Sequence, residues 1–126
     1  MKALEFDHVS YRYPGEDFSI VDNLSFALEQ GSFHCVIGAS GCGKSTILRM
    51  ICGLLRPEAG TIRVGGTPIE EQSHYCGYMP QRDLLLPWRT VGENLALPLE
   101  IRGGYTRAER RELAEAALED VGLEGC

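Results

Sequence analysis

The sequence is poor in lysine, in clustered positive charge and in long hydrophobic runs, and each shortage excludes a class of protein. Only Lys2 and Lys44 are lysines, and 12 basic residues are set against 18 acidic ones, for a net charge of −6. We therefore expect neither a broad basic face for nucleic acid nor direct adhesion to anionic lipid. No stretch approaches the roughly 18 consecutive apolar residues of a membrane span, and acidic residues stand where a signal peptide needs an apolar run. The chain is expected to stay in the cytoplasm.

Closely spaced cysteine pairs are also missing, although the chain has five cysteines. No two of them have C-x-x-C spacing, so the sequence shows neither a zinc motif nor a redox motif. Reduced thiols in a cytosolic protein fit this pattern best. We expect Cys35, Cys52 and Cys76 to be small buried hydrophobic residues. The other two are Cys42 and Cys126.

The length and composition are those of one ordinary folded domain. The chain has 126 residues, of which 44% are hydrophobic, enough to bury a core. Apolar periodicity and turn residues predict the elements. In order, these are a half-buried strand over 24–29, a strand covered on both faces over 33–37, a turn over 38–41, a helix over 44–52, a hairpin of 61–64 with 67–69, a possible strand over 75–79, a loop over 80–89 and helices that begin after residues 90 and 106. This order predicts an α/β domain.

Capping residues and apolar stripes refine the predicted helices. Thr90 with Glu93, and Thr106 with Glu109, have the spacing of capping boxes, and Gly122 is a natural end to the last helix. The apolar stripes expected on the first and last helices are Ile47, Leu48 and Ile51, and Leu113, Ala117 and Val121.

The most specific motif is a glycine-rich loop before the first predicted helix. Residues 38–45 fit the pattern G-x-x-x-x-G-K-[ST]. Glycines let the backbone fold tightly so that N–H groups point at phosphate oxygens, and the following helix presents its positive N-terminal end to the same anion. Lys44 is expected between the β- and γ-phosphates, and the hydroxyl of Ser45 is a hard ligand for Mg²⁺. The predicted phosphate-binding residues are Gly38, Ala39, Ser40, Gly41, Cys42, Gly43, Lys44, Ser45 and Thr46.

Several segments around this loop occur in a fixed order. They are Val9–Tyr13, Val21–Phe26, Gln30–Phe33, Gly53–Ile62 and Tyr78–Gln81. Together with the loop they resemble the nucleotide-binding subunit of an ABC transporter, over essentially the whole chain. The resemblance implies a P-loop NTPase of ABC type, with an N-terminal antiparallel β-subdomain, a P-loop strand–helix unit and the start of a helical subdomain. Residues 1–126 would then be the N-terminal portion of one nucleotide-binding domain, with approximately 1–80 as β-subdomain and P-loop core and 81–126 as glutamine loop and start of the helical subdomain.

The resemblance also implies two ligands, ATP and Mg²⁺, and the roles of individual residues. Tyr13 matches the aromatic residue that stacks on adenine, for which a flat ring offers apolar area and a π face; Tyr11 is the next candidate, and Tyr13 as a plain strand-end aromatic is the alternative. Gln81 matches the glutamine that reaches Mg²⁺ and the attacking water. Lys44 and Gln81 are therefore the candidate catalytic residues, and Ser45 and Gln81 the candidate metal ligands.

An apolar segment with prolines points to the partners. Residues 85–91, followed by Glu93 and Asn94, are similar to importers of nitrate, sulfonates, taurine and related small solutes. Such a surface suits a partner's helix, and Trp88 is the only tryptophan; the alternative is a loop that covers its own core. The resemblance thus implies transmembrane permease subunits bound through the 82–91 region, a second ATP-binding subunit in a homodimer, a solute-binding protein as an indirect partner, no nucleic acid, and a peripheral place on the cytoplasmic face of the cell membrane.

The family's remaining motifs are missing from these 126 residues. There is no L-S-G-G-Q-like signature and no apolar strand that ends in Asp-Glu, and His8, His34 and His74 all come before the place of the family's switch histidine. We therefore expect an incomplete domain, the N-terminal half of a longer protein, that binds ATP but hydrolyses it negligibly by itself. Two other functions stay open: a non-hydrolytic nucleotide-binding remnant, and a DNA-maintenance ATPase, which the negative charge disfavours.

Overall fold

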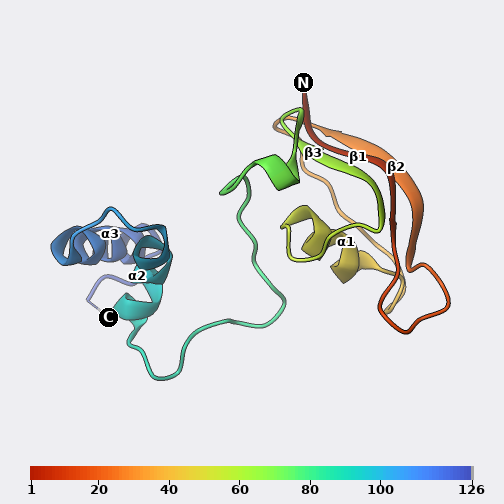
Figure 1. The fold of residues 1–126 in the computed structure, drawn as a ribbon. Coiled ribbons are helices and arrows are strands. Elements are labelled where there is room, and N and C mark those ends of the chain that lie inside the picture. Colours follow the sequence, from red (N-terminus) through yellow and green to blue (C-terminus); the bar gives the residue numbers. More distant parts are fainter. Residues whose placement is uncertain (126) are drawn as a thin grey trace. The chain divides into compact units, whose positions relative to one another are not determined.

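The computed structural model describes residues 1–125; Cys126 lies outside the described residues. The chain forms two compact units, one of residues 1–79 and one that begins at Pro80. The first carries a sheet and one α-helix, and the second carries two α-helices (Figure 1). No helix of residues 1–125 combines the length and the apolar character needed to cross a membrane.

The first unit is built on an antiparallel sheet of four strands in the order β2-β1-β3-β4. The strands are β1 (Lys2–Tyr11), β2 (Val21–Glu29), β3 (Ala59–Val64) and β4 (Thr67–Pro68), and a short 3₁₀ helix, η1 (Ile69–Glu71), follows β4. The hairpin of β3 and β4 pairs Val64 with Thr67 across Gly65 and Gly66. The predicted strand over 24–29 and the predicted hairpin are confirmed, because an alternating pattern and a Gly-Gly turn are strong local signals.

A bulge in β1 decides which of its side chains are buried. Leu4 and Phe6 face the core with the two-residue period of a strand. His8 then has a φ of 52°, and the pairing with β2 shifts register between Phe6 and Val9. Val9 rather than His8 is therefore buried, with 0% of its surface exposed. The extra residue returns the apolar sequence to the core face.

Helix α1 (Lys44–Ile51) lies against this sheet (Figure 1). Met50 is fully buried and belongs to the same core cluster as Phe6 and Ile62. The predicted helix is confirmed, but the predicted stripe is wrong in one member, because Leu48 is 44% exposed. Thr46 is buried in its place, so α1 turns one polar side chain toward the sheet.

The second unit is a pair of helices, α2 (Val91–Arg102) and α3 (Arg107–Asp120). Both predicted capping boxes are present, with the N–H of each glutamate donating to the threonine hydroxyl at 3.2 Å. The threonine N–H groups donate back to the glutamate carboxylates at 2.8 and 2.7 Å. At the other end of α3, Gly122 has a φ of 76°, and the N–H of Leu123 donates to the carbonyl of Leu118 at 2.8 Å. This is the Schellman ending that the glycine predicts.

The buried face of α3 differs from the predicted stripe. Ala114 and Leu118 are buried, whereas Leu113 and Val121 of the predicted stripe are 46% and 69% exposed. Helix α3 therefore has two apolar faces at four-residue spacing, and its packing in this unit covers only one of them. The spacing of apolar residues along a helix does not say which of two apolar faces packs against a neighbouring helix.

Two predicted strands do not form. Residues 33–37 and 75–79 have no strand structure, and the side chains of Phe33 and Ile37 are 89% and 91% exposed instead of covered. A strand needs hydrogen-bonded neighbours, and within residues 1–125 no strand pairs with either segment. The prediction of buried cysteines is also wrong at two positions, since Cys35 and Cys76 are exposed; Cys52 is half-buried.

Candidate phosphate-binding site

The loop before α1 is held tightly by its glycines. Gly41 and Gly43 have φ values of 80° and 105°, in the left-handed region that favours glycine. The N–H of Cys42 donates to the carbonyl of Ala39 at 3.2 Å, which closes a turn. A Cβ on Gly38 would lie only 2.7 Å from Sγ of Cys42. Glycine is therefore favoured at Gly41 and Gly43 by backbone conformation, whereas a side chain at Gly38 would displace the Cys42 thiol.

The N-terminus of α1 is left without a side-chain cap. Its N-cap is Gly43, and no side chain bonds its N–H groups, whereas α2 and α3 both have complete capping boxes. The first bond inside the helix runs from the N–H of Ile47 to the carbonyl of Gly43 at 3.0 Å. The N–H groups of residues 44–46 precede it and have no partner within the helix. These N–H groups and the helix dipole suit an anion.

Lys44 and Ser45 bring a charge and a hydroxyl to the same place. The Nζ of Lys44 folds back over the loop and donates to the carbonyl oxygens of Gly38 and, at 3.2 Å, of Ala39. A phosphate oxygen is a stronger acceptor for an ammonium than a neutral carbonyl. Ser45 is exposed at the helix N-terminus, so its hydroxyl is open to a hard cation such as Mg²⁺. The loop thus fits a phosphate group together with its metal ion.

Tyr13 joins this site through its partly buried hydroxyl. Its phenolic oxygen lies 2.8 Å from Oγ1 of Thr46, and Thr46 is only 3% exposed. The ring of Tyr11 meets the ring of Tyr13 edge to face, with centroids 5.0 Å apart. The structure therefore brings Tyr13 to the first turn of α1, and its contact with adenine stays a prediction. The Thr46 hydroxyl is already hydrogen-bonded to Tyr13, so the backbone N–H of Thr46 is the group left for phosphate.

Gln81 and the 82–91 region belong to the second unit. Gln81 is exposed in the loop before α2, and its role beside the P-loop stays a prediction. Leu85 and Trp88 are 66% and 76% exposed, so this loop does not cover a core within its own unit. Asn94 of α2 holds the loop, because its Oδ1 accepts from the N–H of Leu86 at 2.7 Å.

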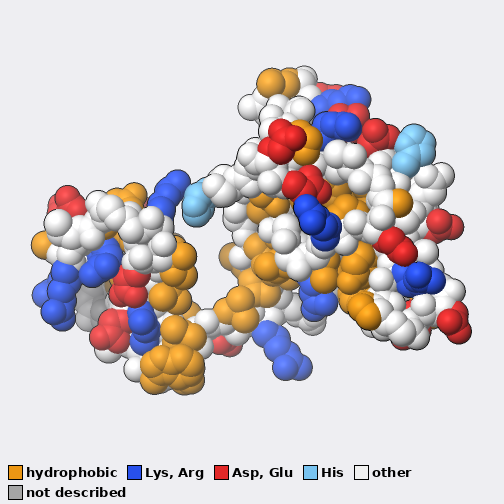
Figure 2. All heavy atoms as spheres, in the orientation of Figure 1, with side chains coloured by type: hydrophobic (Ala, Val, Ile, Leu, Met, Phe, Trp, Pro, Cys, Tyr) orange, Lys and Arg blue, Asp and Glu red, His pale blue; other side chains and the backbone are white. Residues whose placement is uncertain are grey.

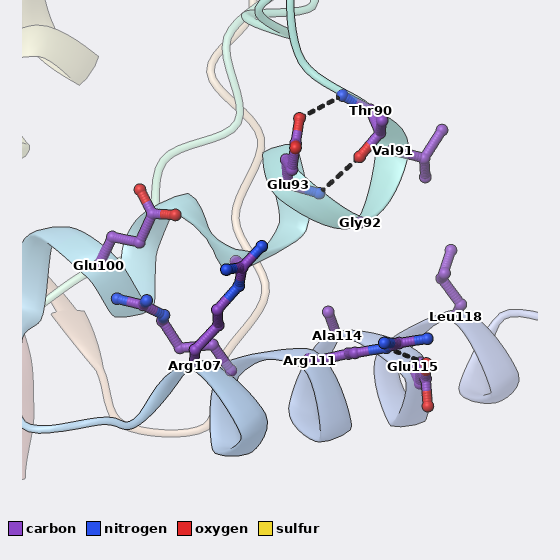
Figure 3. Close-up of a pocket in the computed structure, with 12 residues that line it drawn as sticks. Thr90, Val91, Gly92, Glu93, Glu100, Arg107, Arg111, Ala114, Glu115 and Leu118 are labelled. Carbon is purple, nitrogen blue, oxygen red and sulfur yellow. Dashed lines mark hydrogen bonds and ion pairs between the residues drawn. The ribbon is translucent and has the colours of Figure 1, made fainter.

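A hollow in the second unit was not predicted. It measures about 800 Å³ and lies between α2 and α3, and Figure 3 shows Arg107 and Arg111 of α3 on its wall with Glu100 of α2. Arg89 donates to Glu100 at 2.9 Å, and this hydrogen bond holds the pKa of Glu100 below its ordinary value. Since acidic and basic side chains alternate on its wall, the hollow is a poor anion site. It contains none of the predicted site residues.

The surface shows no broad basic patch in the view of Figure 2, where acidic and basic side chains are interspersed. This arrangement agrees with the net charge of −6. The glycine-rich loop with Lys44 is thus the described feature best suited to bind phosphate.

Comparison with known proteins finds relatives that are similar to this chain in sequence. The chain is 41% identical over 123 residues to the taurine import ATP-binding protein TauB of Chromobacterium violaceum, and the match covers 98% of this chain and 47% of the relative. It is 37% identical to the bicarbonate transport ATP-binding protein CmpD of Synechocystis, covering 95% of this chain and 44% of the relative. The chain therefore spans about half the length of the curated relatives it matches.

The fold also matches a solved structure. The dimeric ATP-binding cassette MJ0796, in a post-hydrolysis state bound to ADP and phosphate, superposes with a TM-score of 0.80 at 27% identity, over 97% of this chain and 58% of that chain. This likeness confirms the predicted fold as part of a P-loop NTPase cassette. The sequence profile of the ABC transporter family matches residues 21–126. The chain belongs to the ABC transporter family.

Proposed function

We propose that this chain supplies the ATP-binding part of an ABC importer subunit. The observation that carries the proposal is the uncapped N-terminus of α1, where a glycine loop, Lys44 and Ser45 meet. The other two α-helices of residues 1–125 satisfy their first N–H groups with capping boxes. The N–H groups of α1 are the ones that remain for a phosphate group.

Each residue of the site has a role in this proposal. The N–H groups of residues 38–46 hold the phosphates, Lys44 neutralises the β- and γ-phosphates, and Tyr13 stacks its ring on adenine. Ser45 and Gln81 supply oxygen ligands for Mg²⁺, which stabilises the charge on the phosphates when bound. Lys44 and Gln81 are the catalytic residues, and they act by positioning and by electrostatic stabilisation.

The relatives supply the substrate class and the partners of the proposal. Two relatives are named for taurine import and bicarbonate transport, so we assign a small solute of the nitrate, sulfonate and taurine kind. The exposed Leu85 and Trp88 in the 82–91 region suit a helix of a membrane permease. The cassette of matching fold is a dimer, so a second copy completes the nucleotide site. The subunit then lies on the cytoplasmic face of the cell membrane, and a solute-binding protein is an indirect partner.

Binding of a fluorescent ATP analogue with Mg²⁺ tests the proposal. Lys44→Ala is expected to raise the dissociation constant at least about tenfold, because it removes the ammonium from the phosphates. Lys2→Ala is the matched control, since Lys2 is the only other lysine and pairs with Glu5 in β1, at 3.4 Å. Equal affinities for the two variants, with both folded by circular dichroism, would refute the assignment of the site.

Hydrolysis by the chain alone tests whether residues 1–126 contain enough of the catalytic machinery for ATP turnover. Residues 1–126 contain no signature or Asp-Glu strand motif, so we expect no measurable ATP turnover by this chain alone. Turnover at an ordinary rate that Lys44→Ala abolishes would contradict this expectation. Binding without turnover agrees with the importer proposal and equally with a non-hydrolytic nucleotide-binding module.

A further inference from the structure

A small hollow opens in the first unit between the turn after α1 and the helix η1. Its volume is about 270 Å³, and its wall is formed by Gly53, Leu55, Arg56, Pro57, Ile69 and Glu70. Ile69 belongs to the buried core cluster, and Leu55 packs against that cluster. The N–H of Leu54 donates to the carbonyl of Arg49 at 2.9 Å, which holds the turn against the end of α1. Part of the wall is therefore apolar and fixed, and the hollow shares no residue with the glycine loop.

Two charges of opposite sign lie on this wall without ion-pair partners. Arg56 and Glu70 are both exposed, and neither belongs to an ion pair within residues 1–125. Glu58, two residues from Arg56, pairs instead with Arg12 at 3.3 Å. Since Arg56 and Glu70 do not pair with each other either, both charges stay free to meet a ligand.

A polar group beside the hollow also lacks a partner. The hydroxyl oxygen of Tyr75 is buried and has no hydrogen-bond partner within residues 1–125. It lies against Gly53 of the wall, because a Cβ on Gly53 would be only 2.9 Å from it. Gly53 has a φ of 76°, so glycine is favoured there by conformation, and its lack of a side chain makes room for the hydroxyl. A buried hydroxyl without a partner is costly, so this wall carries an unmet hydrogen-bond donor.

We propose that the hollow binds a small zwitterion with an aliphatic part, of the size and charge of an α-amino acid such as leucine. The guanidinium of Arg56 suits a carboxylate, and the carboxylate of Glu70 suits an ammonium. Leu55, Pro57 and Ile69 suit the aliphatic part. Pockets for drug-sized ligands start at about 300 Å³, so a hollow of about 270 Å³ suits a smaller molecule.

The site needs both charges of the ligand together. A simple anion that pairs with Arg56 is repelled by the Glu70 carboxylate, and a simple cation that pairs with Glu70 is repelled by Arg56. The carboxylate of the zwitterion is placed at Arg56 and Gly53, where it accepts the hydrogen bond that the Tyr75 hydroxyl lacks. A bond of this kind to a charged acceptor is stronger than one between neutral groups. The hollow therefore selects zwitterions over plain acids and plain amines.

The test is an NMR titration of the full chain with L-leucine, followed through the backbone amide shifts. We expect saturable shift changes at residues 53–56 and 69–70, and none at the glycine loop of residues 38–46. N-acetyl-leucine lacks the ammonium and leucinamide lacks the carboxylate. Each should bind with a dissociation constant at least about tenfold higher than leucine, because each loses one charge-assisted hydrogen bond. Equal affinities for the three compounds, or shift changes that do not saturate, would overturn the proposal.

Single variants test the contacts from the side of the protein. Arg56→Gln and Glu70→Gln should each raise the dissociation constant for leucine at least about tenfold, and Tyr75→Phe should raise it about threefold. Arg49→Gln and Glu71→Gln are the matched controls, because both side chains are exposed and lie outside the wall of the hollow. If these controls weaken binding as much as Arg56→Gln and Glu70→Gln do, the hollow is not the binding site. Unchanged affinity in Tyr75→Phe would overturn the placement of the carboxylate.

Discussion

The phenolic oxygen of Tyr13 lies 2.8 Å from Oγ1 of Thr46, which joins the segment after β1 to the first turn of α1. Thr46 is a buried polar residue, 3% exposed, and a buried hydroxyl is costly to leave unpaired. The bond therefore fixes Tyr13 against the helix that carries the glycine loop. In the proposed function, a ring fixed in this way is preorganised to stack on adenine.

Tyr13→Phe separates the structural role of this bond from the role of the ring. The change leaves the Thr46 hydroxyl buried without its partner, so we expect the free energy of unfolding to fall by about 1–2 kcal/mol. The ring remains, so the affinity for a fluorescent adenine nucleotide is expected to change less than twofold. Tyr13→Ala removes both and should weaken nucleotide binding by about tenfold. Urea unfolding and fluorescence titration measure the two effects.

Tyr11→Phe is the matched control, because no hydrogen bond within residues 1–125 uses the Tyr11 hydroxyl. It should change neither stability nor affinity by a measurable amount. If Tyr13→Ala binds the nucleotide as tightly as the wild type, Tyr13 does not stack on adenine, and Tyr11 becomes the candidate.

Gly60 lies where β3 crosses the bulge of β1. Its φ is 84°, and a Cβ there would overlap the carbonyl oxygens of Asp7 and His8. Gly66 has the same φ of 84° but open space around it. We expect Gly66→Ala to lower the free energy of unfolding by about 1 kcal/mol, from backbone strain alone, and Gly60→Ala by about 3 kcal/mol or more. Equal losses in urea unfolding would show that steric overlap at the bulge does not matter.

Features that depend on neighbours in sequence were predicted well. Both capping boxes need only a threonine and a glutamate three residues later, and the β3–β4 hairpin needs only a Gly-Gly turn between apolar residues. The glycine-rich turn before α1 was also predicted, because glycines at fixed spacing before an apolar helix mark a tight turn; its binding of phosphate stays a prediction. These are the parts of the fold and of the site where local chemistry decides the structure.

Features that depend on distant partners were not predicted. The apolar residues 33–37 read as a buried strand, yet within residues 1–125 no neighbour pairs with them, and Phe33 and Ile37 are exposed. The approach of the Tyr75 hydroxyl to Gly53 has no sequence motif, because two segments distant in sequence create it. The ion pair of Arg89 with Glu100, a residue on the wall of the hollow between α2 and α3, likewise arises only from packing.

The capping box of α3 offers a direct test of local stability in the second unit. Thr106→Ala removes the acceptor of the Glu109 N–H and should cost about 1 kcal/mol. Thr106→Ser keeps an oxygen in the same place and should cost much less. Hydrogen exchange at the first amides of α3 measures the difference. If these amides are equally protected in the Thr106→Ala and Thr106→Ser variants, the capping box does not stabilise α3.

Alkaline pH is expected to destabilise the first unit through Cys52. Burial first, and then Cys76, raise the pKa of this thiol from 9.0 to about 11. A raised pKa in the folded state means that the folded chain holds the proton more tightly than the unfolded chain. The contribution to stability is therefore fully present below about pH 9 and is lost as the pH rises from 9 to about 11.

Urea unfolding of the wild type at a series of pH values, with a reductant present so that no disulfide forms, measures this loss. Cys52→Ala removes the group and should flatten the decline between pH 9 and 11, whereas Cys35→Ala, at an exposed thiol, should leave it unchanged. Burial first, and then the charges of Cys76, Cys52 and Glu70, raise the pKa of Tyr75, so some decline persists in Cys52→Ala. Adding Tyr75→Phe to that variant should remove most of the remainder. An identical decline in the wild type and in Cys52→Ala would mean that the Cys52 thiol ionises as readily in the folded chain as in the unfolded one. The packing around Cys52 would then not shield it from water.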